Sequence, residues 1–162
     1  MESARIPLLD VRDLVVEFAT RRGPVQAVRQ VNLSVAKGET VGIVGESGSG
    51  KSVTSYAVMH ILDRAGRVAD GSIVFSGIDM VEAGQKAVRD LLGREMSMIF
   101  QNPRAALNPI RKVGRQIEDV LLRHVQASRE NAKEKALNIL RQVRIADPEE
   151  RYQLDSHVKC NT

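Results

Sequence analysis

Residues 45–52, GESGSGKS, have the residue types and spacing of a phosphate-binding loop. Its three glycines allow backbone conformations that other residues avoid, so successive N–H groups can point at one anion. A helix beginning near Lys51 would add its positive dipole end, and the Lys51 ammonium would add a full charge. The Ser52 hydroxyl can ligate Mg²⁺, so the pattern predicts binding of ATP with Mg²⁺. The candidate nucleotide contacts are Gly45, Glu46, Ser47, Gly48, Ser49, Gly50, Lys51, Ser52 and Val53.

The segments around this loop predict a strand before it and a helix after it. Residues 40–44, TVGIV, form a short β-branched run that suits a strand buried on both faces. Residues 52–62 carry apolar side chains at helical spacing. A glycine-rich turn without a ligand is the alternative, and it leaves this order of elements unexplained.

The rest of the chain predicts an α/β fold. Residues 9–18 and 31–35 alternate apolar and polar side chains around a turn at 21–24, which indicates an antiparallel β-layer ahead of the loop. Further strands are expected at 73–76 and 96–100. Expected helices follow the apolar spacing at 83–92, 113–121 and 132–143.

Two further residues are candidates for the nucleotide site. Gln101 follows the expected strand 96–100, and ligands of open α/β sheets bind beyond the carboxyl ends of strands. Its amide could touch Mg²⁺ or water, although a polar residue there can also simply begin a loop. Phe18 ends the first expected strand, where an aromatic ring either packs in the core or stacks on adenine.

Composition limits the other classes of function. The 162 residues are 43% hydrophobic and 27% charged, which suits one soluble domain. The net charge is +4, but acidic and basic residues are interleaved and only 3% are aromatic, so we expect no nucleic-acid partner. We see no secretory leader and no apolar run of membrane-spanning length. The single cysteine, Cys160, fits a reducing compartment, so we expect a cytoplasmic protein.

Three segments together resemble one family. VGIVGESGSGKS, GSIVFSG and MSMIFQNPRAALNPI are similar to the ATP-binding subunit of ABC transporters. VRDLVVEF, RRGPVQAV and the Asn108–Pro109 pair look most like the dipeptide and oligopeptide importers, and the resemblance covers about residues 8–150. It implies a P-loop NTPase core of ABC type with an amino-terminal antiparallel β-layer at about 8–102. Part of the helical subdomain would follow at about 103–150, with 151–162 as an off-pattern tail.

The resemblance also implies roles for residues and partners. Residues 45–52 become the Walker A loop, Gln101 becomes the Q-loop glutamine that meets Mg²⁺, and Phe18 becomes the aromatic that stacks on adenine. The helices from 113 to 144 would dock on membrane-spanning transporter subunits, and a second ATP-binding subunit would complete a homodimer or heterodimer. The implied location is the cytoplasmic face of the cell membrane.

The sequence departs from the family pattern after IADPEERYQ. The family continues into an LSGGQ-type signature, a Walker B strand, a D-loop and a switch histidine, whereas this sequence reads LDSHVKCNT. We therefore expect a truncated or frameshifted form that binds ATP and hydrolyses it slowly. Three alternatives remain: a non-hydrolysing ATP-binding or transporter-docking protein, a fragment that does not fold stably, and a P-loop kinase. The β-structure ahead of the loop and the IFQNP segment disfavour the kinase.

Overall fold

The computed structural model describes residues 6–124 and 128–155. Cys160 and most of the expected off-pattern tail lie outside the described residues. The chain divides into two compact units, Met1–Leu92 and Gly93–Thr162. Each unit is described by itself.

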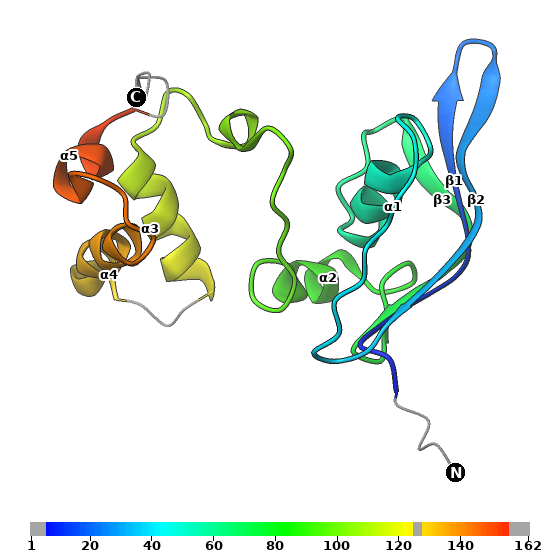
Figure 1. The fold of residues 1–162 in the computed structure, drawn as a ribbon, viewed down its shortest axis with the longest axis horizontal. Helices are drawn as coiled ribbons and strands as arrows, with labels where there is room; N and C mark the ends of the chain where they lie inside the picture. Colours follow the sequence, from blue (N-terminus) through cyan, green and yellow to red (C-terminus); the bar gives the residue numbers. More distant parts are fainter. Residues whose placement is uncertain (1–5, 125–127, 156–162) are drawn as a thin grey trace. The chain divides into compact units, whose positions relative to one another are not determined.

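The first unit contains a four-stranded antiparallel sheet (Figure 1). Its strands lie in the order β2-β1-β3-β4. This sheet confirms the expected antiparallel β-layer, with β1 and β2 joined by a tight turn at residues 21 and 22. The bounds are β1 (Leu9–Thr20), β2 (Gly23–Val35), β3 (Gly66–Phe75) and β4 (Ile78–Asp79).

A line of backbone irregularities crosses the three long strands of this sheet. Asp13 in β1 and Gln30 in β2 have positive φ angles of 48° and 50°, and Gly71 in β3 has a φ of 88°. A Cβ atom on Gly71 would lie 2.5 Å from the carbonyl oxygens of Arg12 and Asp13, so only glycine fits there. The Asp13 amide donates to Asn32 Oδ1 at 2.9 Å, which ties the β1 irregularity to β2.

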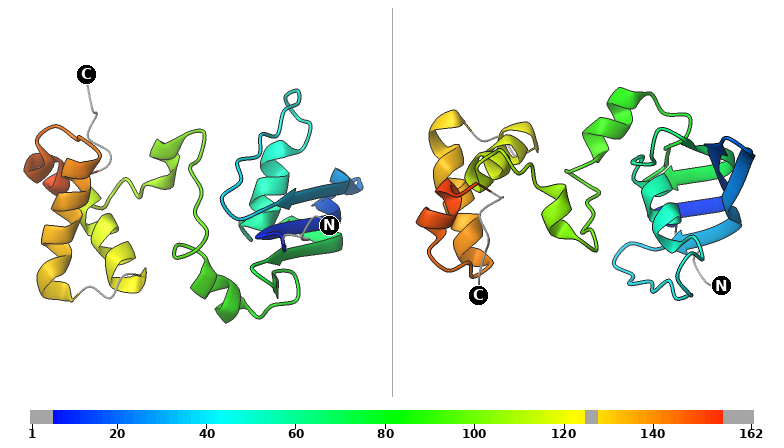
Figure 2. Two further views of the ribbon diagram at one scale, coloured as in Figure 1. Left: turned by 60° about the horizontal axis from the view of Figure 1, so that its bottom comes forward. Right: turned by 90° about the horizontal axis from the view of Figure 1, so that it is seen from above.

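One helix, α1 (Lys51–Val58), packs on one face of the sheet and contacts β1, β2 and β3 (Figures 1 and 2). Its buried residues are Thr54, Ala57 and Val58. The sequence predicted a helix to residue 62, but the helix ends four residues earlier. His60 has a φ of 53°, and the Ile61 amide donates to the Tyr56 carbonyl at 3.0 Å. This left-handed termination closes the helix.

The predictions of buried strands at 40–44 and 96–100 are wrong for this structure. Neither segment forms a strand, and Val44 and Ile99 are 96% and 93% exposed. A strand buried on both faces needs hydrogen-bonded neighbours and a covering layer on each face. Among the described residues no strand pairs with either segment.

A second helix, α2 (Gln85–Leu91), completes the first unit and is shorter than the expected 83–92. It buries Val88 and Leu91, while Met80, just after β4, is fully buried. The center of the sheet core consists of fully buried aliphatic side chains from β1 and β3. They are Leu14, Val16 and Ile73.

The second unit is helical (Figure 2). It contains η1 (Pro103–Ala106), α3 (Val113–His124), α4 (Arg129–Gln142) and α5 (Pro148–Gln153). The two amphipathic helices expected here are confirmed as α3 and α4. Their apolar faces meet α5 in a cluster formed by Leu121, Ala136, Leu140 and Tyr152. None of the helices in the described part of the chain has the length and apolarity needed to cross a membrane.

Candidate nucleotide-binding site

The loop at 45–52 curls around the start of α1. Gly48 and Gly50 have φ angles of 82° and 90°, a region that L side chains rarely adopt. Gly50 is the N-cap of α1, and the Thr54 amide donates to its carbonyl at 2.8 Å. Because Gly50 offers no side-chain cap, the first N–H groups of α1 are not bonded by a capping side chain and are suited to an anion.

The Lys51 ammonium lies within the curl of this loop. Its Nζ donates to the carbonyl oxygens of Gly45 and Glu46, each at 2.6 Å, and to Ser49 Oγ at 3.2 Å. A Cβ atom on Gly45 would lie 2.8 Å from Ser49 Oγ, so the loop closes tightly where it begins. The charge is thus held at the position where the loop would meet a phosphate group.

The loop is open to solvent and carries hydroxyl groups near the Lys51 ammonium. Residues 45–49 and Ser52 are exposed, whereas Lys51 and Val53 are partly buried. A hydroxyl such as that of Ser52 is a suitable ligand for Mg²⁺, which prefers oxygen donors and keeps several waters. The arrangement therefore fits a magnesium-bound phosphate chain, although the described residues contain no cluster of three or more acidic, histidine or cysteine side chains suited to a metal.

Phe18 lies in β1 opposite Val25 of β2 and Gly66 of β3. A Cβ atom on Gly66 would be 2.7 Å from Phe18 Cε1, so the ring covers the glycine directly. Phe18 shares its face of β1 with Val16, and this is the face on which α1 packs. The ring is only partly buried, and its stacking on adenine stays a prediction.

Gln101 belongs to the second unit and lies in an exposed bend just before η1. It follows residues 96–100, but these do not form the strand that the sequence indicated. Its contact with Mg²⁺ therefore also stays a prediction.

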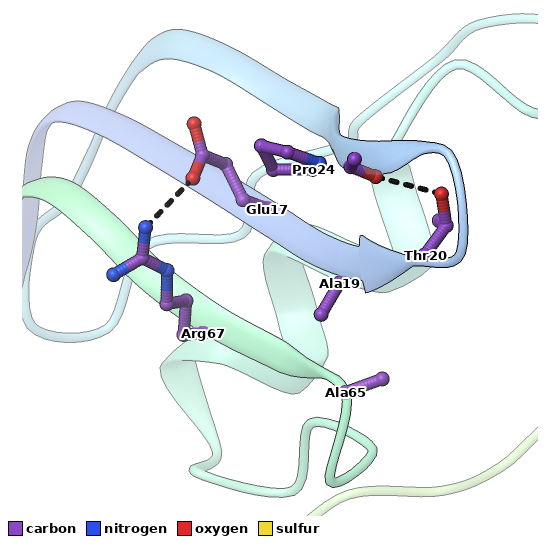
Figure 3. Close-up of a pocket in the computed structure, with 7 residues that line it drawn as sticks. Glu17, Ala19, Thr20, Pro24, Ala65 and Arg67 are labelled. Carbon is purple, nitrogen blue, oxygen red and sulfur yellow. Dashed lines mark hydrogen bonds and ion pairs between the residues drawn. The ribbon is translucent and has the colours of Figure 1, made fainter.

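A separate cavity of about 350 Å³ lies at the turn end of β1 and β2 (Figure 3). Glu17 and Arg67 form an ion pair at 3.1 Å in its wall, and the Thr20 hydroxyl donates to the Gly23 carbonyl at 2.6 Å. Glu17 alternates with Phe18 along β1, so the cavity opens on the other face of the sheet from the ring. None of residues 45–52 lines it.

Sequence reasoning missed a polar group buried in the helical unit. Glu118 is 6% exposed, and it accepts hydrogen bonds from the Tyr152 hydroxyl and, at 2.7 Å, from Arg115. Burial, followed by the hydrogen bond and the charge of Glu118, raises the pKa of Tyr152 to about 12. The nearby Glu118 carboxylate also raises the pKa of Arg115. The available signal was that Glu118 falls beside the apolar positions Ile117 and Leu121 of the expected helix.

Comparisons with known proteins show the family to which the chain belongs. The family profile described as ABC transporter matches residues 28–159. The chain is 48% identical over 145 residues to the oligopeptide transport ATP-binding protein OppD of Bacillus subtilis, covering 89% of this chain and 40% of that protein. It is 43% identical over 150 residues to the dipeptide transport ATP-binding protein DppD of Haemophilus influenzae, covering 93% and 46%. The chain thus spans less than half the length of these relatives.

Solved structures share the fold. A dimeric bacterial ABC transporter cassette superimposes with a TM-score of 0.76 at 19% identity, covering 91% of this chain and 61% of that one. A dimeric ATP-binding cassette bound to ADP and Pi gives a TM-score of 0.72 at 20% identity, covering 91% and 63%. These likenesses confirm the expected α/β fold of ABC type. Because the family profile also matches well over half of the residues, the chain belongs to the ABC transporter family.

Proposed function

We propose that this chain binds MgATP through the loop at 45–52. The observation that carries the proposal is the position of Lys51, whose ammonium is held by the carbonyls of Gly45 and Glu46 within a glycine-rich curl at the start of α1. In this structure the ammonium donates only to neutral acceptors, which are these two carbonyl oxygens and the Ser49 hydroxyl. A triphosphate would offer it full negative charges, so exchange of partners favours binding.

Each residue of the loop has a role in this proposal. The N–H groups of residues 47–51 form the phosphate nest, Lys51 contacts the outer phosphates, and Ser52 ligates Mg²⁺. Val53 and the side chains of Glu46, Ser47 and Ser49 border the phosphate chain. Phe18 would stack on adenine, and Gln101 is the further candidate for contact with the metal. Bound Mg²⁺ would neutralise charge on the phosphates.

The names of the relatives suggest the larger setting. Two of them are an oligopeptide and a dipeptide transport ATP-binding protein. We propose that the chain serves as the ATP-binding, energy-coupling part of a peptide-importing ABC transporter. Its partners would then be membrane-spanning subunits and a second ATP-binding subunit, and it would work on the cytoplasmic face of the membrane.

The test is equilibrium binding of a non-hydrolysable ATP analogue to the 162-residue chain. Lys51→Ala removes a charge-assisted contact worth roughly 1.5–3 kcal/mol, which lowers affinity about ten- to a hundredfold. Lys86→Ala, at an exposed position of α2, is the matched control and should leave affinity unchanged. Chelation of Mg²⁺ should weaken binding to the unmodified chain but have a smaller effect on Lys51→Ala. Equal affinity of Lys51→Ala and the unmodified chain would refute the assignment.

Binding and turnover require separate measurements. Phosphoryl transfer also needs a group that orients or activates water and a carboxylate that holds the metal. The residues assigned above supply neither group. A steady-state ATPase assay run beside the binding assay therefore distinguishes an active ATPase from a protein that only binds nucleotide.

A further inference from the structure

The loop at 45–52 approaches the sheet at Gly50. A Cβ atom on Gly50 would lie 2.9 Å from the carbonyl oxygen of Ala27 and 3.4 Å from Cγ2 of Val28. The backbone of Gly50 therefore rests directly on β2. Val28 is 3% exposed, so its side chain fills the space beneath the loop without access to solvent.

This contact coincides with a bulge in β2. From Val16 to Phe18 the register between β1 and β3 is regular, with Val16 opposite Val68 and Phe18 opposite Gly66. Between β1 and β2, however, Val16 pairs with Val28 while Glu17 pairs with Gln26. Ala27 is therefore an additional residue in β2. A bulge bends its strand and redirects the neighbouring groups, and here those groups are the ones that meet Gly50.

We propose that Val28 is a positioning residue for the phosphate loop. Together with the Ala27 carbonyl it supports Gly50 and holds the loop in the conformation that binds phosphate. This inference rests on the proposed binding of MgATP.

The part of the loop ahead of Gly50 is open to solvent. Residues 45–49 are exposed, and the contacts of Lys51 are made within the loop itself. Gly50 has a φ of 90° and begins α1, so a shift of Gly50 would move the N–H groups of the helix start as well. A loop that is already ordered binds with a smaller entropic cost. Removing the support under Gly50 should therefore weaken phosphate binding even though Val28 is buried beneath the loop.

The experiment measures binding of MgATP and of magnesium tripolyphosphate, which lacks the nucleoside, to the full chain. Val28→Ala should weaken both ligands by the same factor, about three- to tenfold, which corresponds to roughly 0.7–1.4 kcal/mol. Val11→Ala is the matched control, because Val11 is equally buried in the same sheet but pairs with Leu33 and Ile73. Val28→Thr keeps a branched side chain of nearly the same shape and should restore the affinity for both ligands.

Stability is measured first by thermal unfolding without ligand. Both alanine variants remove two buried methyl groups and should lower Tm by similar amounts, whereas only Val28→Ala should lose affinity for tripolyphosphate. If Val28→Ala does not fold, Val28→Cys, which keeps one γ atom, takes its place. Equal tripolyphosphate affinity of the Val28 and Val11 variants would overturn the inference, as would a loss confined to ATP. Failure of the unmodified chain to bind either ligand would overturn the proposed function itself, and this inference with it.

Discussion

The Tyr152 hydroxyl donates a hydrogen bond to the Glu118 carboxylate, joining α5 to α3 across 34 residues of sequence. Both side chains are buried, and Arg115 donates to the other carboxylate oxygen at 2.7 Å. Lys133 lies 5.7 Å from the center of the tyrosine ring. The hydrogen bond therefore adds a buried polar link to an otherwise apolar cluster and helps to hold α5 on α3.

Removing Glu118 should loosen α5. Glu118→Ala leaves a buried hydroxyl without its acceptor, which costs roughly 1–3 kcal/mol. Amide hydrogen exchange of α3 and α5 should accelerate accordingly, while exchange in the sheet of the first unit stays the same. Glu134→Ala, at an exposed position of α4, is the control and should change stability by no more than about 0.5 kcal/mol. Similar exchange in the two variants would show that the buried hydrogen bond contributes little.

The same hydrogen bond predicts a dependence on alkaline pH. The pKa of Tyr152 is raised from 10.0 to about 12 in the folded chain, so folding favours the protonated phenol. The stabilisation is fully present below pH 10 and is lost as pH rises from about 10 to 12. The phenol faces Glu118, Arg115 and Lys133. The trend persists beside the two cations, because ionising Tyr152 would place the phenolate against the Glu118 carboxylate. Tyr152→Phe should abolish this part of the pH dependence, measured by hydrogen exchange of α5 and by tyrosinate absorbance. An unshifted absorbance titration would contradict it.

Gly114 should not accept a side chain. A Cβ atom there would lie 2.1 Å from Cδ2 of Tyr152, so the ring would have to move away from Glu118. Alanine gains about 1 kcal/mol of helix propensity over glycine. Overpacking typically costs 1–3 kcal/mol, so we expect Gly114→Ala to destabilise the helical unit on balance. The double variant Gly114→Ala/Tyr152→Leu should be less unstable than the sum of the single changes, because the ring that causes the clash is gone. Additive losses in urea unfolding would show that the two positions are independent.

Phe18 should contribute to binding of ATP but not of tripolyphosphate. Loss of base–aromatic stacking in Phe18→Ala is expected to weaken ATP binding by roughly 1–3 kcal/mol. Phe18→Tyr should have a mild effect because its ring also stacks. A collapse of the thermal transition in Phe18→Ala without nucleotide would instead show that the ring serves the core, where it covers Gly66.

The backbone geometry of the loop at 45–52 could be predicted from sequence because it depends on the positions of its glycines. Glycine at positions 48 and 50 permits positive φ angles, and both residues have them in the structure. The antiparallel strands were predictable for a similar reason, since β1 and β2 pair through a short turn. The secondary structure of residues 40–44 and 96–100 could not be predicted from local sequence. Their strand propensity is high, but a buried strand is stabilised by partners distant in sequence.

The packing of Tyr152 was not indicated by the sequence. It lies in a stretch assigned to an off-pattern tail, yet it is 4% exposed and packs against Gly114. A short helix that begins with an aspartate and a proline carries little periodicity, so α5 had no apolar pattern to reveal it. The partner of the tyrosine, Glu118, sits on α3 and can be found only from the packing of α3 against α5.

The backbone irregularities at Asp13, Gln30 and Gly71 help to set the register in which the strands of the sheet pair. If β1 slid by one residue against both neighbouring strands, the carbonyl oxygens of Arg12 and Asp13 would no longer lie over Gly71 of β3, and the Asp13 amide would lose the hydrogen bond that it donates to Asn32 of β2. The same slip would turn Leu14 and Val16 toward water. These contacts therefore favour the observed hairpin register, and that register brings the Ala27 bulge under the loop at 45–52.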